Sequence, residues 1–358
     1  MAPDNENLLY IGHQNLTYTP GSFRQIYASE FGKYLCPVDR FGILKQIGVT
    51  DPFDFVSITP WVKFDLNNLT NDWWDRYVNT FDVVANNVYK TAGDRKIAVL
   101  YSGGIDSTAM LIALMRHPDY QERLTSNRFY LALTTPASTL ENSEFFYTEL
   151  LGTVPMTAAD YNQLMQDDTS LVVTALGGDG IIGCLSSLRY IPDLVDFLHL
   201  PVTDIAPYRE LNRRDPSRLL TKIVASTKVY CPFDVESLNQ IFWWFNQCFA
   251  LQNKLCNPYV WTETKDLSLL ASNQKIYRFY MDPIWSTFSY EYMSTNPKYT
   301  NLDSLRSYPK KYIMDYTGNL NYLRTPIVLD ERTLYKAQTK TRIYADLSYK
   351  FDDTKIAT

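Results

Sequence analysis

Paired cysteines and clustered histidines are absent from this sequence. Its five cysteines lie far apart, and none belongs to a Cys-x-x-Cys pair. Only three histidines occur, and they are scattered along the chain. These counts argue against a disulfide scaffold and against a zinc site built from cysteine or histidine. A reducing, cytoplasmic environment fits this cysteine usage best.

Long apolar runs are also lacking. No stretch is long enough to cross a bilayer, and no basic segment followed by an apolar one marks a secretory signal. The net charge of −5 provides no general attraction to nucleic acid, although a local basic patch is compatible with it. We therefore expect a cytoplasmic protein that does not bind membranes.

The sequence does contain a large apolar fraction, arranged in alternating strand and helix patterns. With 358 residues, 46% of them hydrophobic, the chain can bury a substantial core in two or three lobes. The spacing of apolar residues predicts helices near 71–92, 106–117 and 141–151, and strands at 96–101, 128–134 and 171–176. This alternation predicts an α/β fold with a parallel sheet, helices on both faces, and ligands beyond the carboxyl ends of the strands.

The strand signal fades after about residue 195, where helical patterns such as 235–255 take over. The chain is therefore expected to have four regions: a short mixed region at 1–70, an α/β domain at 71–195, a mainly helical lobe at 196–330 and a basic and aromatic tail at 331–358.

The most informative stretch is Ser102-Gly103-Gly104-Ile105-Asp106-Ser107-Thr108, which joins a predicted strand to a predicted helix. Its two glycines allow a sharp turn and a close approach of the backbone to a ligand. The first turn of the following helix has N–H groups without intrahelical partners, and the helix dipole favours negative charge there. These features predict a phosphate cradle, although the chain has no Gly-x-x-x-x-Gly-Lys-Ser/Thr loop. The competing interpretation is a tight turn in which Ser or Asp caps the helix.

A second glycine-rich loop, Gly177-Gly178-Asp179, follows another predicted strand. The carboxyl ends of parallel strands share one sheet edge, so both loops are expected to open on the same side. Mg²⁺ typically binds one or two carboxylates together with substrate phosphates. Asp106 and Asp179 are therefore the predicted metal pair, although Asp179 taken alone also fits an ordinary turn residue.

The first loop resembles the PP-loop of the N-type ATP pyrophosphatases, which split ATP into AMP and pyrophosphate. The segment 175–183 looks like the corresponding segment of the synthetase domain of asparagine synthetase. Weaker matches to the same family occur at 140–145, 278–282 and 310–314, so the resemblance spans roughly 70–325. It implies a PP-loop α/β domain, of the adenine nucleotide alpha hydrolase type, that binds ATP and Mg²⁺.

The resemblance also implies roles for individual residues. Metal binding falls to Asp106 and Asp179. Positive charge near the adenylate would come from Lys310 or Lys311, although a lysine pair on a surface helix is more often simply solvated. The residues implied in nucleotide binding are Ser102, Gly103, Gly104, Ser107, Thr108, Gly177 and Gly178 around the phosphates, and Leu100, Leu133 and Thr134 around the adenine.

Two departures from the family narrow the implied activity. Leu176 and Gly180 replace the two glutamates of the second loop, and Leu176 cannot accept a proton during amine attack. A glutaminase half needs an N-terminal cysteine, but residue 2 is Ala2, so we expect no ammonia from glutamine. The implied activity is a ligase that adenylates a small-molecule, peptide or nucleobase acceptor and releases pyrophosphate. An amine from an amine donor then displaces AMP. The expected protein partners are further copies of the chain in a homo-oligomer, or a separate protein that supplies the amine.

Two alternatives stay open at the level of sequence. One is a PP-loop enzyme that modifies tRNA or another nucleic acid, with the tail at 331–358 as a basic and aromatic contact surface. The other is a nucleotide-binding protein without catalytic activity, because both second-loop glutamates are missing. The retained carboxylates and loop hydroxyls argue against that second alternative.

Overall fold

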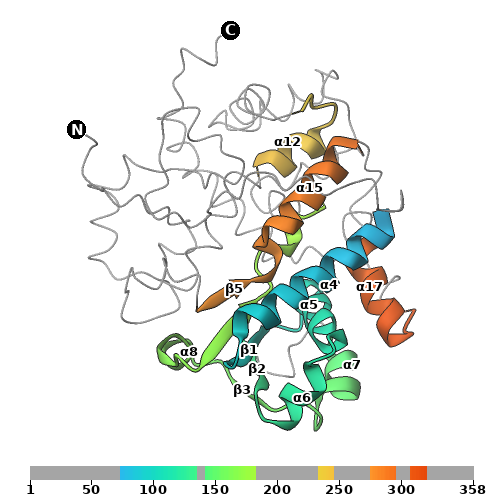
Figure 1. Cartoon of the computed structure of the whole chain (residues 1–358). Coiled ribbons are helices and arrows are strands. Elements are labelled where there is room, and N and C mark those ends of the chain that lie inside the picture. The colour runs from blue at the N-terminus through green and yellow to red at the C-terminus, as the bar shows by residue number, and fades with distance from the viewer. Residues whose placement is uncertain (1–72, 135–141, 183–232, 246–274, 296–306, 321–358) are drawn as a thin grey trace, which may run out of the picture.

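The computed structural model describes residues 73–134, 142–182, 233–245, 275–295 and 307–320. The predicted N-terminal region at 1–70 and the tail at 331–358 lie outside these residues. The centre of the described fold is a five-stranded, all-parallel sheet with the strand order β3-β2-β1-β4-β5 (Figure 1). The strands are β1 Lys96–Tyr101, β2 Phe129–Leu133, β3 Met156–Ala158, β4 Ser170–Thr174 and β5 Ile276–Arg278.

The central strands β1 and β4 are mostly apolar, and both of their faces are covered. Every residue of β4, and every residue of β1 after Lys96, is buried. Continuous apolar runs of this kind are typical of parallel strands that lie between two layers. In register, Val99 of β1 pairs with Leu131 of β2 on one side and with Val173 of β4 on the other.

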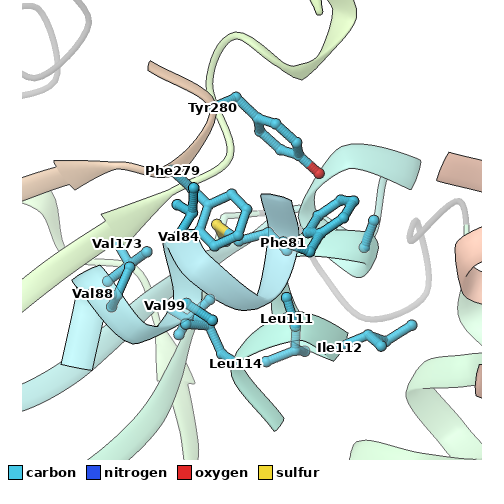
Figure 2. Packing of buried hydrophobic residues seen from close by; sticks show 14 of the residues in the cluster. Phe81, Val84, Val88, Val99, Leu111, Ile112, Leu114, Val173, Phe279 and Tyr280 are labelled. Atoms are coloured by element: carbon cyan, nitrogen blue, oxygen red, sulfur yellow. The ribbon is translucent and has the colours of Figure 1, made fainter. Parts of the chain in front are cut away.

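Helices pack against both faces of the sheet. On one face lie α4 Trp73–Ala92 and α5 Ile105–Arg116, and Figure 2 shows Val88 of α4 beside Val173 of the sheet. On the opposite face lies α8 Tyr161–Gln166, which contributes Leu164 and Met165 to a core with Ala98 and Leu100. The prediction of an α/β fold with a parallel sheet is therefore confirmed.

An aromatic cluster joins the helices that follow the sheet to α4. It involves α15 Pro283–Thr295 and α17 Ser307–Thr317, which reach α4 from the later part of the chain (Figure 1). Phe81 is fully buried; its ring stacks on Tyr312 of α17 at 4.3 Å and meets the edge of Trp285 of α15 at 4.9 Å. Aromatic pairs at these separations stabilise the packing beyond their buried area.

Several shorter elements complete the fold. They are α6 Tyr120–Thr125, α7 Ser143–Phe145 running into the π-helix Phe146–Leu150, the 3₁₀ turns Gly178–Gly180 and Phe279–Met281, and α12 Leu238–Phe245. Within the described part of the chain, none of the helices has the length and apolarity that a membrane crossing requires.

The sequence predictions held for the long elements and missed the short ones. The helix expected near 71–92 and the strand expected at 96–101 correspond closely to α4 and β1. One strand lies in the region expected to be mainly helical: β5 at 276–278, which pairs with β4. Three residues are too few to show a periodic pattern, which also explains why β3 was missed. The helix expected at 235–255 is described only up to residue 245, and that part contains α12.

Phe81→Ala should strongly destabilise the protein, because it removes a fully buried ring from the contact between α4, α15 and α17. We expect a loss of about 3–5 kcal/mol in the free energy of unfolding, measured by urea denaturation with tryptophan fluorescence. Tyr147→Ala is the control, because Tyr147 is 52% exposed and should change stability by less than about 0.5 kcal/mol. Equal unfolding midpoints for the two variants would contradict this role of Phe81.

Candidate functional site

The two glycine-rich loops leave neighbouring strands at the same edge of the sheet. The first loop follows β1 and the second follows β4, and these strands pair directly. The strand order places β2 and β3 on one side of β1, and β4 and β5 on the other. In open parallel sheets, the crevice at such a reversal of strand order is the usual place for ligands. The predicted common edge for the two loops is confirmed.

The backbone of the first loop leaves the start of α5 without a side-chain cap. Gly103 has a φ of 70°, a left-handed conformation that glycine adopts without strain. Gly104, which has no side chain, occupies the N-cap position, so neither Ser nor Asp stands there. The alternative in which Ser or Asp caps this helix is therefore wrong. An uncapped helix start directs N–H groups and the positive end of the helix dipole toward an anion.

Two of the loop hydroxyls lie next to each other at the turn, that of Ser102 on an exposed residue and that of Ser107 on a buried one. Ser102 is exposed, and its Oγ lies 3.1 Å from the Oγ of Ser107. The Ser107 hydroxyl donates to the carbonyl oxygen of Gly104 at 3.0 Å. These bonds hold both hydroxyls beside the glycine backbone, where the predicted phosphate contacts would form.

Thr108 has different hydrogen-bond partners from the two serines. Its side chain is fully buried, and its Oγ1 lies 3.2 Å from the Tyr101 hydroxyl. The same Oγ1 accepts a hydrogen bond of 3.2 Å from the side-chain amide of Asn142. Thr108 thus braces the loop from inside, while its predicted contact with phosphate stays a prediction.

Asn142 is a site residue that the motif analysis did not single out. Its backbone N–H and its Nδ2 both donate to the carbonyl oxygen of Gly103, at 2.9 and 2.7 Å. The weak family match at 140–145 covers this residue, but nothing in the sequence indicated which of its side chains meets the first loop. The contact between Asn142 and Gly103 is visible only in the folded structure.

The second loop touches the carboxylate of Asp106. Gly177 has a φ of 106°, and the chain then enters the 3₁₀ turn that carries Gly178 and Asp179. A Cβ built on Gly178 would lie 2.7 Å from each carboxylate oxygen of Asp106 and nearer still to its Cγ. Because a side chain has no room at that position, the carboxylate packs directly against the backbone that bears Asp179. The predicted closeness of these two loops is confirmed.

Two buried tyrosines lie behind the carboxylates. The Tyr280 hydroxyl donates to the backbone carbonyl oxygen of Asp106 at 3.0 Å. Burial raises the pKa of Tyr280 well above its usual value, and the negative charges of Asp106 and Asp179 act in the same direction. Burial likewise raises the pKa of Tyr77 on α4, with Asp106 as the next cause. Both phenols therefore stay neutral, so Tyr280 acts as a hydrogen-bond donor rather than as a base.

Tyr280 belongs to the segment 278–282 that weakly matched the family. This segment follows β5 and leads into α15, whose start is held by Asp282: its Oδ1 accepts from the backbone N–H of Ile284 at 3.0 Å. Asn87 of α4 donates to the other carboxylate oxygen of Asp282 at 3.3 Å. Asp282 thus stabilises the helix start, while Tyr280 reaches the site.

The residues predicted to contact adenine lie at the ends of β1 and β2. Leu100 sits inside the sheet, paired with Ala132 and Thr174. The carbonyl of Leu133 accepts from the backbone N–H of Ala159 at 2.9 Å. Thr134 donates twice to the carbonyl of Tyr101, from its backbone N–H at 3.0 Å and from its hydroxyl at 3.3 Å. Their contact with adenine stays a prediction.

The predicted lysines lie on α17, which packs against α4 and α5. Lys310 is 4% exposed. Lys311 forms an ion pair of 2.7 Å with Asp315, and its ammonium lies 3.6 Å from the ring centre of Trp74. The Lys311 side chain is thus engaged at the surface between α17 and α4. The role predicted for either lysine near a nucleotide stays a prediction.

Among the described residues, no three side chains of His, Cys, Asp or Glu gather into a group that would hold a metal by themselves. No protein-family model matches the chain, and neither a curated protein nor a solved structure shows significant similarity to it. The resemblance to the PP-loop family therefore rests on the residues of the two loops alone.

Gly178→Ala should displace the Asp106 carboxylate, because the added methyl group would overlap it. We expect a lower thermal midpoint of unfolding and a changed environment of Asp106, followed by the carboxyl ¹³C signal of that residue. Gly152→Ala is the control: it introduces a side chain at a φ of 82°, but nothing lies within 4 Å of the new Cβ. Gly152→Ala should therefore leave the Asp106 signal unchanged. An unshifted signal in Gly178→Ala would contradict the contact between the loops.

Proposed function

We propose that the chain is an ATP-dependent ligase of the PP-loop type. It adenylates a carboxylate, or an equivalent oxygen, of an acceptor and releases pyrophosphate, after which an amine displaces AMP. The contact of Gly178 with the Asp106 carboxylate is the observation that supports this proposal most strongly. It unites an uncapped helix start with a second carboxylate loop at the switch point of the sheet, where nucleotides bind in such folds.

The residues present suit a nucleotide triphosphate. The N–H groups at the start of α5, together with the hydroxyls of Ser102 and Ser107, form a set of donors for phosphate oxygens. The absence of a Cβ at Gly178 and the left-handed turns at Gly103 and Gly177 let the backbone approach closely. A pyrophosphate leaving group would meet these donors as its charge develops, which is where such contacts accelerate a reaction.

Asp106 and Asp179 suit Mg²⁺, because that ion takes one or two carboxylates and completes its shell with phosphate oxygens and water. When bound, the ion would neutralise charge on the departing pyrophosphate. The protein's own contribution is to hold Asp106 in place, through the Gly178 contact and through the bond from Tyr280 to the Asp106 backbone.

The acceptor half of the reaction is where this chain differs from asparagine synthetases. Leu176 is half-buried just after β4, at the position of a family glutamate, and its side chain cannot take a proton from an amine. We therefore propose that the amine is already nucleophilic, or is deprotonated by a group from a partner. The acceptor is a small molecule, a peptide or a nucleobase.

The glycine spacing of the second loop also matches that of a dinucleotide-binding fingerprint. Gly178-x-Gly180-x-x-Gly183 has the required spacing after a strand. In the dinucleotide-binding fold, however, that motif forms the turn after the first strand. Here it follows β4, whereas the turn after β1 carries Ser102-Gly103-Gly104 and the carboxylate of Asp106. The loop positions therefore favour ATP over a dinucleotide.

Asp106→Asn should lower the rate of pyrophosphate release from Mg-ATP by at least about 100-fold, because it removes the charge that would hold the metal. The assay follows pyrophosphate during incubation with panels of carboxylates, peptides and nucleosides. Asp119→Asn is the matched control, because Asp119 is an exposed carboxylate at the start of α6. It should leave the rate unchanged.

Two results would count against the ligase. Calorimetry that detects no ATP binding by the wild-type protein would remove its basis. ATP binding without pyrophosphate release for any acceptor would instead favour the non-catalytic alternative.

A further inference from the structure

We propose that Asn142 is a positioning residue that sets the direction of the Gly104 N–H for phosphate binding, an inference that rests on the proposed function. Asn142 donates twice to the carbonyl oxygen of Gly103, from its backbone N–H at 2.9 Å and from its Nδ2 at 2.7 Å. A carbonyl oxygen has two lone pairs, so both can be used by this one residue. Asn142 is buried, at 8% exposure, which shields these bonds from water.

The planarity of the peptide group converts this bond into control over the next N–H. Gly103 C=O and Gly104 N–H belong to one trans peptide and point in opposite directions. Holding the carbonyl against Asn142 therefore turns the Gly104 N–H to the other side of the loop. In the structure that N–H lies 3.4 Å from the Oγ of Ser102, the exposed hydroxyl of the cradle.

Two adjacent glycines need such an external constraint. Glycine populates positive and negative φ almost equally, so the Gly103–Gly104 peptide has no side chain that selects one orientation. Gly103 has a φ of 70° and Gly104 a φ of −74°. With its carbonyl free, the peptide between them would exchange with flipped orientations in which the N–H points inward. Asn142 removes that freedom.

The side chain of Asn142 does not cap the helix that it precedes. Asn142 occupies the N-cap position of α7, where an Asn side chain normally accepts a bond from the helix backbone. No such cap bond is present at this helix start, and the Nδ2 group instead bridges Gly103 and the Oγ1 of Thr108. The Tyr101 hydroxyl, 3.2 Å from the same Oγ1, holds Thr108 in position. The side-chain amide of Asn142 therefore bonds to the first loop and to α5, and not to the backbone of α7.

The experiment measures the Gly104 amide directly. In protein labelled with ¹⁵N-glycine, which has fourteen glycines, the Gly104 signal should shift in Asn142→Ala before any ligand is added. Calorimetry with magnesium pyrophosphate, and separately with ATP, should then show about tenfold weaker binding, as expected when one hydrogen bond to a charged ligand is misdirected. Asn142→Asp keeps the size of the side chain but removes its donors, and it should give the same two changes.

Gln240→Ala is the matched control. The Gln240 amide also makes a buried bond to a backbone carbonyl, from its Nε2 to Met293 at 2.7 Å, but on α12 and α15. It should lower the thermal midpoint of unfolding without changing pyrophosphate affinity. Equal losses of affinity in the Gln240 and Asn142 variants would reduce the role of Asn142 to general stability and overturn the proposal.

We call the two hydrogen bonds from Asn142 to the Gly103 carbonyl oxygen the clamp. Different results would overturn the clamp and the proposed function. An unshifted Gly104 signal in both Asn142 variants would overturn the clamp, whatever the ligand results. A shifted signal in a protein whose wild type binds neither ATP nor pyrophosphate would support the clamp and count against the ligase.

Discussion

The packing of the Asp106 carboxylate against the bare backbone of Gly178 is the constraint on which the rest of the site depends. It fixes the spacing between the start of α5 and the turn that carries Asp179. A Cβ at 178 would overlap the carboxylate, so any larger residue there would have to displace it. The contact therefore brings the loop after β1 and the loop after β4 together at one point.

The scaffold around this contact is rigid for identifiable reasons. The central strands pair on both sides, and their side chains are buried on both faces. The aromatic rings of α4, α15 and α17 pack behind the carboxylates, with Tyr77 and Tyr280 fully buried there. Donors from outside the loop, Asn142 and Tyr280, fix two of its carbonyls. Each of these contacts restricts a backbone that its glycines would otherwise leave mobile.

The sequence predicted those parts of the fold that depend on local periodicity. The apolar run 96–101 and the spacing of α4 correctly indicated a buried strand and an amphipathic helix. The glycines marked the two loops, and the parallel direction of the preceding strands predicted that both loops share one edge of the sheet. Asn142 and Tyr280 could not be found in this way, because their roles arise from contacts between distant segments. The strand β5 escaped notice because three residues at 276–278 carry no recognisable pattern.

The hydrogen bond from Tyr280 to Asp106 also bears on how the protein matures during synthesis. It joins residues 174 positions apart, and β5, which precedes Tyr280, is the last strand in chain order among the described residues. At a translation rate of about 5–20 residues per second, those 174 residues take roughly 9 to 35 seconds to follow Asp106 from the ribosome. During that interval the first loop exists without its brace from behind. A nascent chain would therefore complete the support of this loop late, after Tyr280 has emerged.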